Sequence, residues 1–400
     1  MRISLALSLL LAATAAQAQP DSVARDCERT ADAKVDISDQ RAFQKYQKDW
    51  LEICERAIAI DGGNPRVQVA LARAYSSTGR QEAAVKLYRA AAAQDNAEAW
   101  HSLYERYKSY ERGDVNKPQL VTRAEAEQGL RKAAELGHPY ATMMLATLLD
   151  RGGTVKRDPV QAIYWAAQAL TRASKDSDRG SLLMFYGRLL AKSANPDERA
   201  RGIKILEGLS NGRGDAKAEL AKVIRAEDPV RARKLLEDTR RSHSGYSLPL
   251  LTEMLIKGEG GPKDEKRAVS LLAGGTISDA PSVLAARGRL MVEGRLVPRD
   301  LQKGVGLIDH HGRWDYDARL EVMRLLAANP GVTVSYPGGL LYDATEAIEL
   351  GEPGAMAALI ELKLSGHVQF GDKAGGCALV AKAANSGDPA AAKHAAQCAN

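Results

Sequence analysis

The chain has 400 residues, with 56 Lys and Arg against 50 Asp and Glu, and a formal net charge of +6 at pH 7. This small bias, without a dense basic stripe, argues against nucleic acid as a partner, although it permits attraction to an anionic polysaccharide, to peptidoglycan or to an acidic protein face. Hydrophobic residues make up 45% and aromatic residues 5%, and together with abundant alanine this composition favours a folded, all-α protein.

The first 18 residues have the features of a cleaved signal peptide. Arg2 precedes a short apolar run over residues 3–13, and the segment ends in Ala-Gln-Ala at 16–18, the small-x-small form that signal peptidase cuts. The apolar run is about half the length that a bilayer span needs, and no cysteine adjoins the cut to carry a lipoprotein anchor. We therefore expect cleavage after Ala18 and a periplasmic or secreted protein with no membrane span.

The next part of the chain has the pattern of a helical repeat. Residues 19–63 predict an N-terminal helical cap with a partial repeat, which ends in the turn sequence Asp-Gly-Gly-Asn-Pro at 61–65. The following unit has small, large apolar and aromatic residues at helical spacing: Leu71, Ala72, Tyr75, Ala84 and Tyr88. It resembles the tetratricopeptide repeat, a family that fills these positions with Leu, Gly, Tyr, Ala and an aromatic residue. Gln68 and Asn96 depart from the family's Trp and Pro. A second unit starts at Trp100, so we expect tetratricopeptide-like repeats over 64–120, interrupted from residue 110 by a stretch without periodicity.

A three-position template recurs further along: an Asp, a small residue four positions later, and a large apolar residue seven positions later. With a degenerate copy at Pro196, the copies follow one another at a mean step of about 36 residues. The short acceptor side chain of Asp suits a helix N-cap, and the other two positions share one helical face that a neighbouring helix can approach. We predict helix caps at Asp158, Asp228, Asp264, Asp300, Asp343 and Asp372.

This template lies in a region that is similar to SEL-like repeats, relatives of the tetratricopeptide repeat with a longer connecting loop. Ala-Ala-Glu-Leu-Gly at 133–137 is followed by a second helical segment, a glycine-containing loop, Asp-Pro at 158–159 and Ala-x-x-Trp at 162–165. The resemblance implies an all-α fold, a right-handed superhelical solenoid of stacked helix-turn-helix repeats. It places SEL-like repeats over 121–386 and a C-terminal capping helix over 387–400.

Two stretches fit the repeat less well. Residues 174–214 are rich in Lys, Arg, Ser and Asn, and residues 329–340 break the helical pattern with prolines and glycines. The second stretch is either a loop that binds a partner or a tolerated insertion.

The four cysteines favour two disulfides. Cys377 and Cys398 lie at equal distances from a Gly-Asp-Pro turn at 387–389, so they face each other in a helical hairpin, and Cys27 and Cys54 flank a polar linker in the same way. Metal ligation is the alternative, but the cysteines lack the close C-x-x-C spacing of structural zinc sites.

No motif in the sequence predicts a catalytic residue, a cofactor or a metal ion. The richest cluster, residues 309–317, contains His310 and His311, but adjacent histidines on a helix point about 100° apart and do not easily face one ion. They suit the last turn of a helix, where a cationic ring interacts favourably with the dipole. We keep His310, His311 and Tyr336, which lies in the irregular 329–340 stretch, as weak candidates for a surface site.

Two classes of function follow. The resemblance implies a protein-interaction scaffold or regulator that holds one or more envelope proteins on its concave face, since SEL-like envelope proteins include scaffolds of exopolysaccharide secretion and regulators of envelope signalling. The alternative is a cell-wall-acting hydrolase or glycan-binding protein. Cysteine-rich SEL-like proteins proposed to act on cell walls carry a cysteine pair in nearly every repeat, whereas here only the two ends have one.

Overall fold

The computed structural model describes residues 20–31, 40–113, 118–173, 176–239, 247–273, 280–312 and 315–399. All regular structure in these ranges is helical, so the predicted all-α fold class is confirmed. None of the described helices is both long and apolar enough to cross a membrane. The predicted signal peptide, residues 1–18, lies outside the described ranges.

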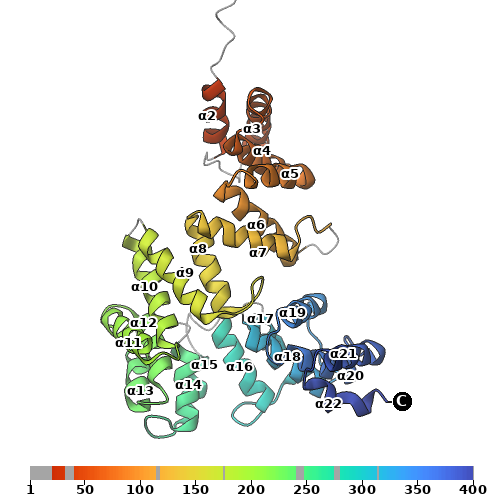
Figure 1. Ribbon diagram of the computed structural model, residues 1–400. Coiled ribbons are helices and arrows are strands. Elements are labelled where there is room, and N and C mark those ends of the chain that lie inside the picture. The colour runs from red at the N-terminus through yellow and green to blue at the C-terminus, as the bar shows by residue number, and fades with distance from the viewer. Residues whose placement is uncertain are drawn as a thin grey trace, which may run out of the picture. The chain divides into compact units, whose positions relative to one another are not determined.

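The chain forms two compact units, Met1–Leu145 and Ala146–Asn400, with the boundary inside helix α8. In the first unit, each helix up to residue 135 packs mainly on its neighbours in sequence (Figure 1). Its helices are α2 (Pro20–Ala31), α3 (Gln40–Ile60), α4 (Pro65–Ser77), α5 (Gln81–Ala92), α6 (Ala97–Gly113), α7 (Arg123–Glu135) and α8 (Pro139–Arg151). Around Cys27, Trp50 and Leu71, the first three of these helices bury one apolar cluster.

The second unit continues the same pattern of helical hairpins, the arrangement of a helical-repeat solenoid. Its first helices are α9 (Pro159–Arg172), α10 (Asp176–Ala191), α11 (Pro196–Ser210), α12 (Gly214–Ile224), α13 (Pro229–Asp238), α14 (Ser247–Lys257) and α15 (Glu265–Ala273). The later ones are α16 (Pro281–Glu293), α17 (Leu301–Gly312), α18 (Tyr316–Ala328), α19 (Pro337–Glu349), α20 (Ala355–Leu364), α21 (Lys373–Asn385), α22 (Ala390–His394) and the 3₁₀ turn η2 (Ala395–Gln397).

Five of the six aspartates occupy helix N-caps. In each, the carboxylate accepts a hydrogen bond from the backbone N–H three residues later, at 2.9 to 3.0 Å: Asp158, Asp228, Asp264, Asp300 and Asp372. In all but Asp228, the backbone N–H of the same aspartate also donates to a carbonyl of the preceding helix, nine residues back, at 2.9 to 3.1 Å. The capping residue therefore starts the second helix of a hairpin and ties it to the first.

Asp343 is not a cap, and that prediction was wrong. Helix α19 starts at Pro337, with Tyr336 at its N-cap, and the proline presets the backbone of the first helical residue. Asp343 lies within the helix, where its carboxylate pairs with Arg319 at 2.6 Å. Arg319 also pairs with the buried Asp309 at 2.9 Å, so Asp343 belongs to an ion-pair group between helices.

The small residue of the template is buried, as its role requires. Ala232 and Ala268 are fully buried, and Gly304 comes close to the backbone of α16. The large residue at position seven is only half-buried in most copies, whereas the residue at position eight, such as Leu236 or Ile308, is fully buried. The face that packs on the neighbouring helix is thus formed by residues four positions apart, at positions four and eight of the template.

The irregular 329–340 stretch is a packed element. Val332 and Val334 are buried, and the side chains of Gln302 and Gln369 bond to the backbone of this stretch from two sides. His367 adds a bond from its ring to the carbonyl of Val332, at 2.7 Å. Since its backbone is held by these side chains, the stretch joins neighbouring repeats.

The four cysteines form two disulfides, the pairing that the turn positions predict. Cys27 of α2 is bonded to Cys54 of α3, with the Cα atoms 4.9 Å apart. Cys377 of α21 is bonded to Cys398, just beyond η2, with the Cα atoms 5.4 Å apart. The structure therefore has disulfides, and not metal ligation, at these four cysteines, and the two links lie near the two ends of the described chain.

Candidate functional site

One cavity of the first unit lies between the start of α5, the end of α6 and residues 118–121, with a volume of about 760 Å³. A tight turn shapes one wall, because Gly79 adopts a left-handed conformation (φ 83°) that ends α4 and reverses the chain into α5. The lining residues are Gly79, Arg80, Gln81, Glu82, Ala83, Val85, Lys86, Arg106, Ser109, Pro118, Leu120 and Val121.

Apolar and basic groups occupy different parts of this cavity. Val85 and Val121 are buried and Leu120 is half-buried, so they form an apolar floor. The cavity is also lined by three cationic side chains, Arg80, Lys86 and Arg106, and by one carboxylate, Glu82. An apolar floor with a positive rim suits a ligand that combines apolar groups with negative charge.

Arg106 is the lining residue with the clearest unused binding capacity. One of its terminal nitrogens donates to the side-chain carbonyl of Gln81 at 3.2 Å, and its buried Nε–H has no hydrogen-bond partner. Arg80, by contrast, pairs with the exposed Glu55 at 3.4 Å. Because the Nε–H is enclosed, an entering carboxylate would meet the terminal nitrogens of this half-buried guanidinium, and a charge-assisted hydrogen bond there favours an acidic ligand.

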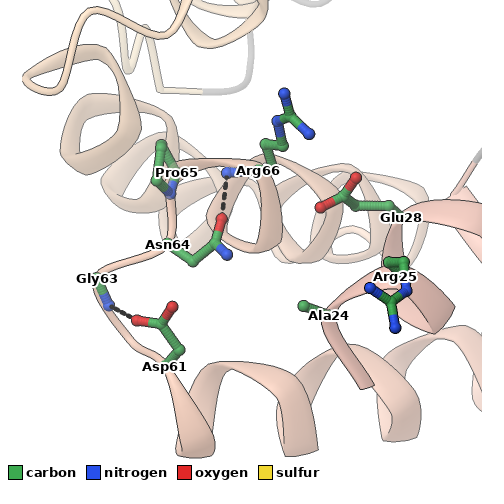
Figure 2. A pocket seen from close by; sticks show the side chains of 8 residues that line it. All are labelled: Ala24, Arg25, Glu28, Asp61, Gly63, Asn64, Pro65 and Arg66. Atoms are coloured by element: carbon green, nitrogen blue, oxygen red, sulfur yellow. Dashed lines mark hydrogen bonds between the residues drawn. The ribbon is translucent and has the colours of Figure 1, made fainter. Parts of the chain in front are cut away.

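A second pocket, of about 580 Å³, lies between α2 and the turn that joins α3 to α4 (Figure 2). Two of its acceptor side chains, those of Asp61 and Asn64, are occupied by neighbouring backbone groups. Asp61 accepts from the backbone N–H of Gly63 at 3.2 Å, and Asn64 caps α4 by accepting from the N–H of Arg66 at 3.0 Å. These side chains therefore shape the turn.

A cluster of titratable groups lies where α6 meets the start of α8. Glu98 and His101, one turn apart on α6, meet His138, whose Nε2 lies 3.0 Å from Glu98 Oε2. The rings of His101 and His138 stack with their centroids 4.3 Å apart, and Tyr140 packs edge-on against His101. The metal-binding atoms of these two histidines and Glu98 all lie within 4.8 Å of one another.

The neighbours of this cluster shift its pKa values. Burial and the nearby His138 lower the pKa of His101 to about 4, against the opposing effect of Glu98. The hydrogen bond from His138 holds the pKa of Glu98 below its usual value, although burial acts in the opposite direction. At neutral pH His101 is therefore neutral and Glu98 is ionised.

The weak surface candidates do not form a site together. His310 is exposed on α17, while the half-buried His311 has a lowered pKa because of burial and lies 3.8 Å from Asp315. Tyr336 is 42% exposed at the start of α19. Among the described residues, neither histidine shares a hydrogen bond or ion pair with Tyr336.

Sequence reasoning missed both the cavity and the histidine cluster. The available signal for the cluster was Glu-x-x-His at 98–101 near the start of a predicted helix, together with His138 directly after a helix-ending glycine. The cavity had no local signal, since residues from three separate segments line it.

The stacked hairpins and capped repeats define the class as an all-α helical-repeat protein. Residues 51–107 match the tetratricopeptide repeat family, and this stretch includes much of the cavity wall. The predicted tetratricopeptide resemblance is thus confirmed for this stretch, and the rest of the described chain continues as helical hairpins. A comparison with curated proteins gives no match.

Solved structures of repeat proteins are similar over much of the chain. A Sel1 repeat protein from Oxalobacter formigenes is 18% identical, with 78% of this chain and 90% of that chain covered and a TM-score of 0.39. The protective antigen c5321 of uropathogenic Escherichia coli, which has an SLR fold, is 18% identical over 85% of this chain and 73% of its own, with a TM-score of 0.39. Yeast Tom70 is 12% identical over 95% of this chain and 96% of its own, with a TM-score of 0.41. At such TM-scores these matches carry no functional information.

Proposed function

We propose that the protein is an interaction scaffold that holds a segment of a partner protein in the cavity between α5, α6 and residues 118–121. Tetratricopeptide and SEL-like repeats generally serve as protein-interaction scaffolds, and the cavity adjoins the segment that matches the tetratricopeptide family. The observation that carries the proposal is the apolar floor with a basic rim that includes the half-buried guanidinium of Arg106. A partner segment with apolar side chains and a carboxylate fits these groups.

The proposed location is the periplasm or the outside of the cell. Two disulfides are characteristic of an oxidising compartment, and the predicted signal peptide gives a route to it. Within that location, a scaffold in exopolysaccharide secretion or a regulator of envelope signalling is the finer role that we propose.

A glycan-binding or cell-wall-hydrolysing protein is the alternative. The basic rim would attract an anionic polysaccharide, but glycosidic hydrolysis usually needs two carboxyl groups about the scissile bond. Among the residues that line the described cavity, Glu82 is the single carboxylate. The cavity therefore favours binding over hydrolysis, and its apolar floor favours a peptide over a glycan.

The test starts from crosslinking in the native envelope. A photoreactive residue in place of Ala83, which lines the cavity, should capture a specific protein, and one in place of the exposed Lys234 on α13 should not. The captured protein is then purified and its affinity is measured by calorimetry. Recovery of cell-wall glycan alone would show that the protein-scaffold proposal is wrong.

Charge reversal separates the cavity from the general surface. We expect Lys86→Glu to weaken binding of the purified partner by about tenfold, or about 1.4 kcal/mol, because the rim becomes less positive. Lys234→Glu makes the same change in net charge elsewhere and should leave the affinity unchanged. Equal effects of the two substitutions would mean that the partner responds to overall charge and not to this cavity.

A further inference from the structure

Three side chains with metal-binding atoms converge in the first unit, outside the cavity described above. Glu98 and His101 share one face of α6, and His138 precedes α8. We propose that Glu98, His101 and His138 bind a Zn²⁺ ion, with a fourth position left to water or a ligand. This proposal does not depend on the scaffold function.

The donor set is one that zinc uses. Two imidazoles and one carboxylate, with an open fourth position, form a common zinc environment in proteins. With bond lengths of about 2.0–2.2 Å, tetrahedral geometry places ligand atoms about 3.4 Å apart. The three ligand atoms already lie within 4.8 Å of one another. Glu98 Oε2 already lies 3.0 Å from His138 Nε2, so the remaining adjustment is a rotation of the His101 and His138 rings out of their stacked arrangement, which directs both lone pairs at the ion.

Glu105 lies close enough to His101 to orient its ring after a small movement. Its Oε1 lies 3.7 Å from His101 Nε2, and both atoms are buried without a hydrogen-bond partner. Metal-binding histidines usually donate their second ring N–H to a carboxylate or carbonyl, which fixes the ring. A hydrogen on Nε2 directed at Glu105 leaves the lone pair of Nδ1 for the ion.

His138 is an unusual residue for its position. It caps α8, where the backbone N–H of Ala141 donates to Nδ1 at 3.2 Å. Equivalent caps in the same unit are Asn64 and Asn96, the residue type that helix N-caps prefer. Local helix formation does not require an imidazole here, and this ring is aimed at Glu98 and stacked on His101.

Zinc binding requires the ring hydrogen of His138 to move from one nitrogen to the other. With Nδ1 accepting from Ala141, the neutral ring carries its hydrogen on Nε2, where it faces Glu98. When Nε2 coordinates the ion, that hydrogen moves to Nδ1 through solvent and the cap bond is given up. The loss of a cap costs about 1 kcal/mol, or about a fivefold weaker affinity, which several coordinate bonds outweigh.

Calorimetry with Zn²⁺ on the metal-free, untagged full chain tests the proposal. We expect one ion per chain, a Co²⁺ complex with the visible absorption of tetrahedral coordination, and at least tenfold weaker zinc binding in Glu98→Gln. His138→Ser should also lose zinc while it keeps a good capping oxygen on α8. Glu105→Gln should weaken binding about 10- to 100-fold if Glu105 orients His101.

A matched control uses the other histidine pair. The double variant His310→Gln, His311→Gln removes two imidazoles from α17 and should bind zinc like the unmodified chain. The proposal is wrong if the unmodified chain takes up no zinc, if His138→Ser binds as tightly as the unmodified chain, or if the α17 variant loses binding instead. Circular dichroism of each variant separates lost ligation from lost folding, and the exposed Glu98 gives a variant that leaves packing intact.

Discussion

The close approach of α16 and α17 makes the sharpest prediction about the repeat itself. A Cβ at Gly304 would lie 2.8 Å from the carbonyl oxygen of Gly288 and 2.9 Å from a methyl carbon of Val292. The carbonyl belongs to the backbone and cannot move aside as a flexible side chain would. Gly304→Ala therefore forces the two helices apart, an overpacking that costs about 1–3 kcal/mol.

The same helix contains its own control. Gly306 is exposed, and a Cβ there meets nothing within 4 Å. Gly306→Ala should stabilise the fold by about 0.5–1 kcal/mol through helix propensity alone. Because Gly304→Ala gains the same propensity, we expect its net destabilisation to be about 1 kcal/mol, the middle of the overpacking range less the helix gain.

Urea unfolding followed by circular dichroism measures both variants. The midpoint should fall for Gly304→Ala and rise for Gly306→Ala, with the slope of each transition unchanged. If Gly304→Ala were as stable as the unmodified chain, or if both variants were destabilised equally, the argument that the small residue permits close packing would be refuted.

Three further predictions concern the caps, the charges and the covalent links. Asp264→Ala should lower the free energy of unfolding by about 1 kcal/mol and leave partner affinity unchanged, and a matching loss of affinity would instead give this aspartate a binding role. Ion pairing with Arg225 lowers the pKa of Glu253 to about 2, so its stabilising effect is complete above the ordinary pKa of 4.5 and is lost as the pH falls towards 2. Melting temperatures of Glu253→Gln and the unmodified chain should thus differ at neutral pH and converge near pH 2, and a constant difference would contradict this. Replacement of Cys377 and Cys398 by Ser should cost about 3 kcal/mol by the loop-entropy estimate, provided that mass mapping of the non-reduced chain recovers this pair.

The architecture was predictable because each repeat specifies its own helix ends. A capping Asp acts through bonds to residues three positions away, so its signal is complete within a short stretch of sequence. What that stretch could not reveal is the second bond of the same residue, from its backbone N–H to the preceding helix. That bond depends on how the loop folds back.

The error at Asp343 shows where local pattern is insufficient. Asp343, Ala347 and Leu350 match the template, yet the helix starts earlier, after Tyr336. Tyr336 stands 36 residues after Asp300 and 36 before Asp372, so the regular period is kept by a residue that makes no side-chain cap bond. The repeat period predicts the start of this helix better than the residue type does, because stacking of neighbouring repeats depends on their spacing and tolerates a weak cap.

The candidate sites were hidden for a related reason. In a helical repeat, most residues that are easy to recognise serve the repeat, as the capping aspartates and the glycines of the turns do. A candidate binding residue can be recognised only where its residue type differs from the type that its position in the repeat favours. His138 is such a departure, since an Asn would cap α8 as well and would leave Glu98 and His101 without an imidazole partner. The same comparison, applied to each cap and small position of the repeat, separates residues that build the array from residues that the array presents to a ligand.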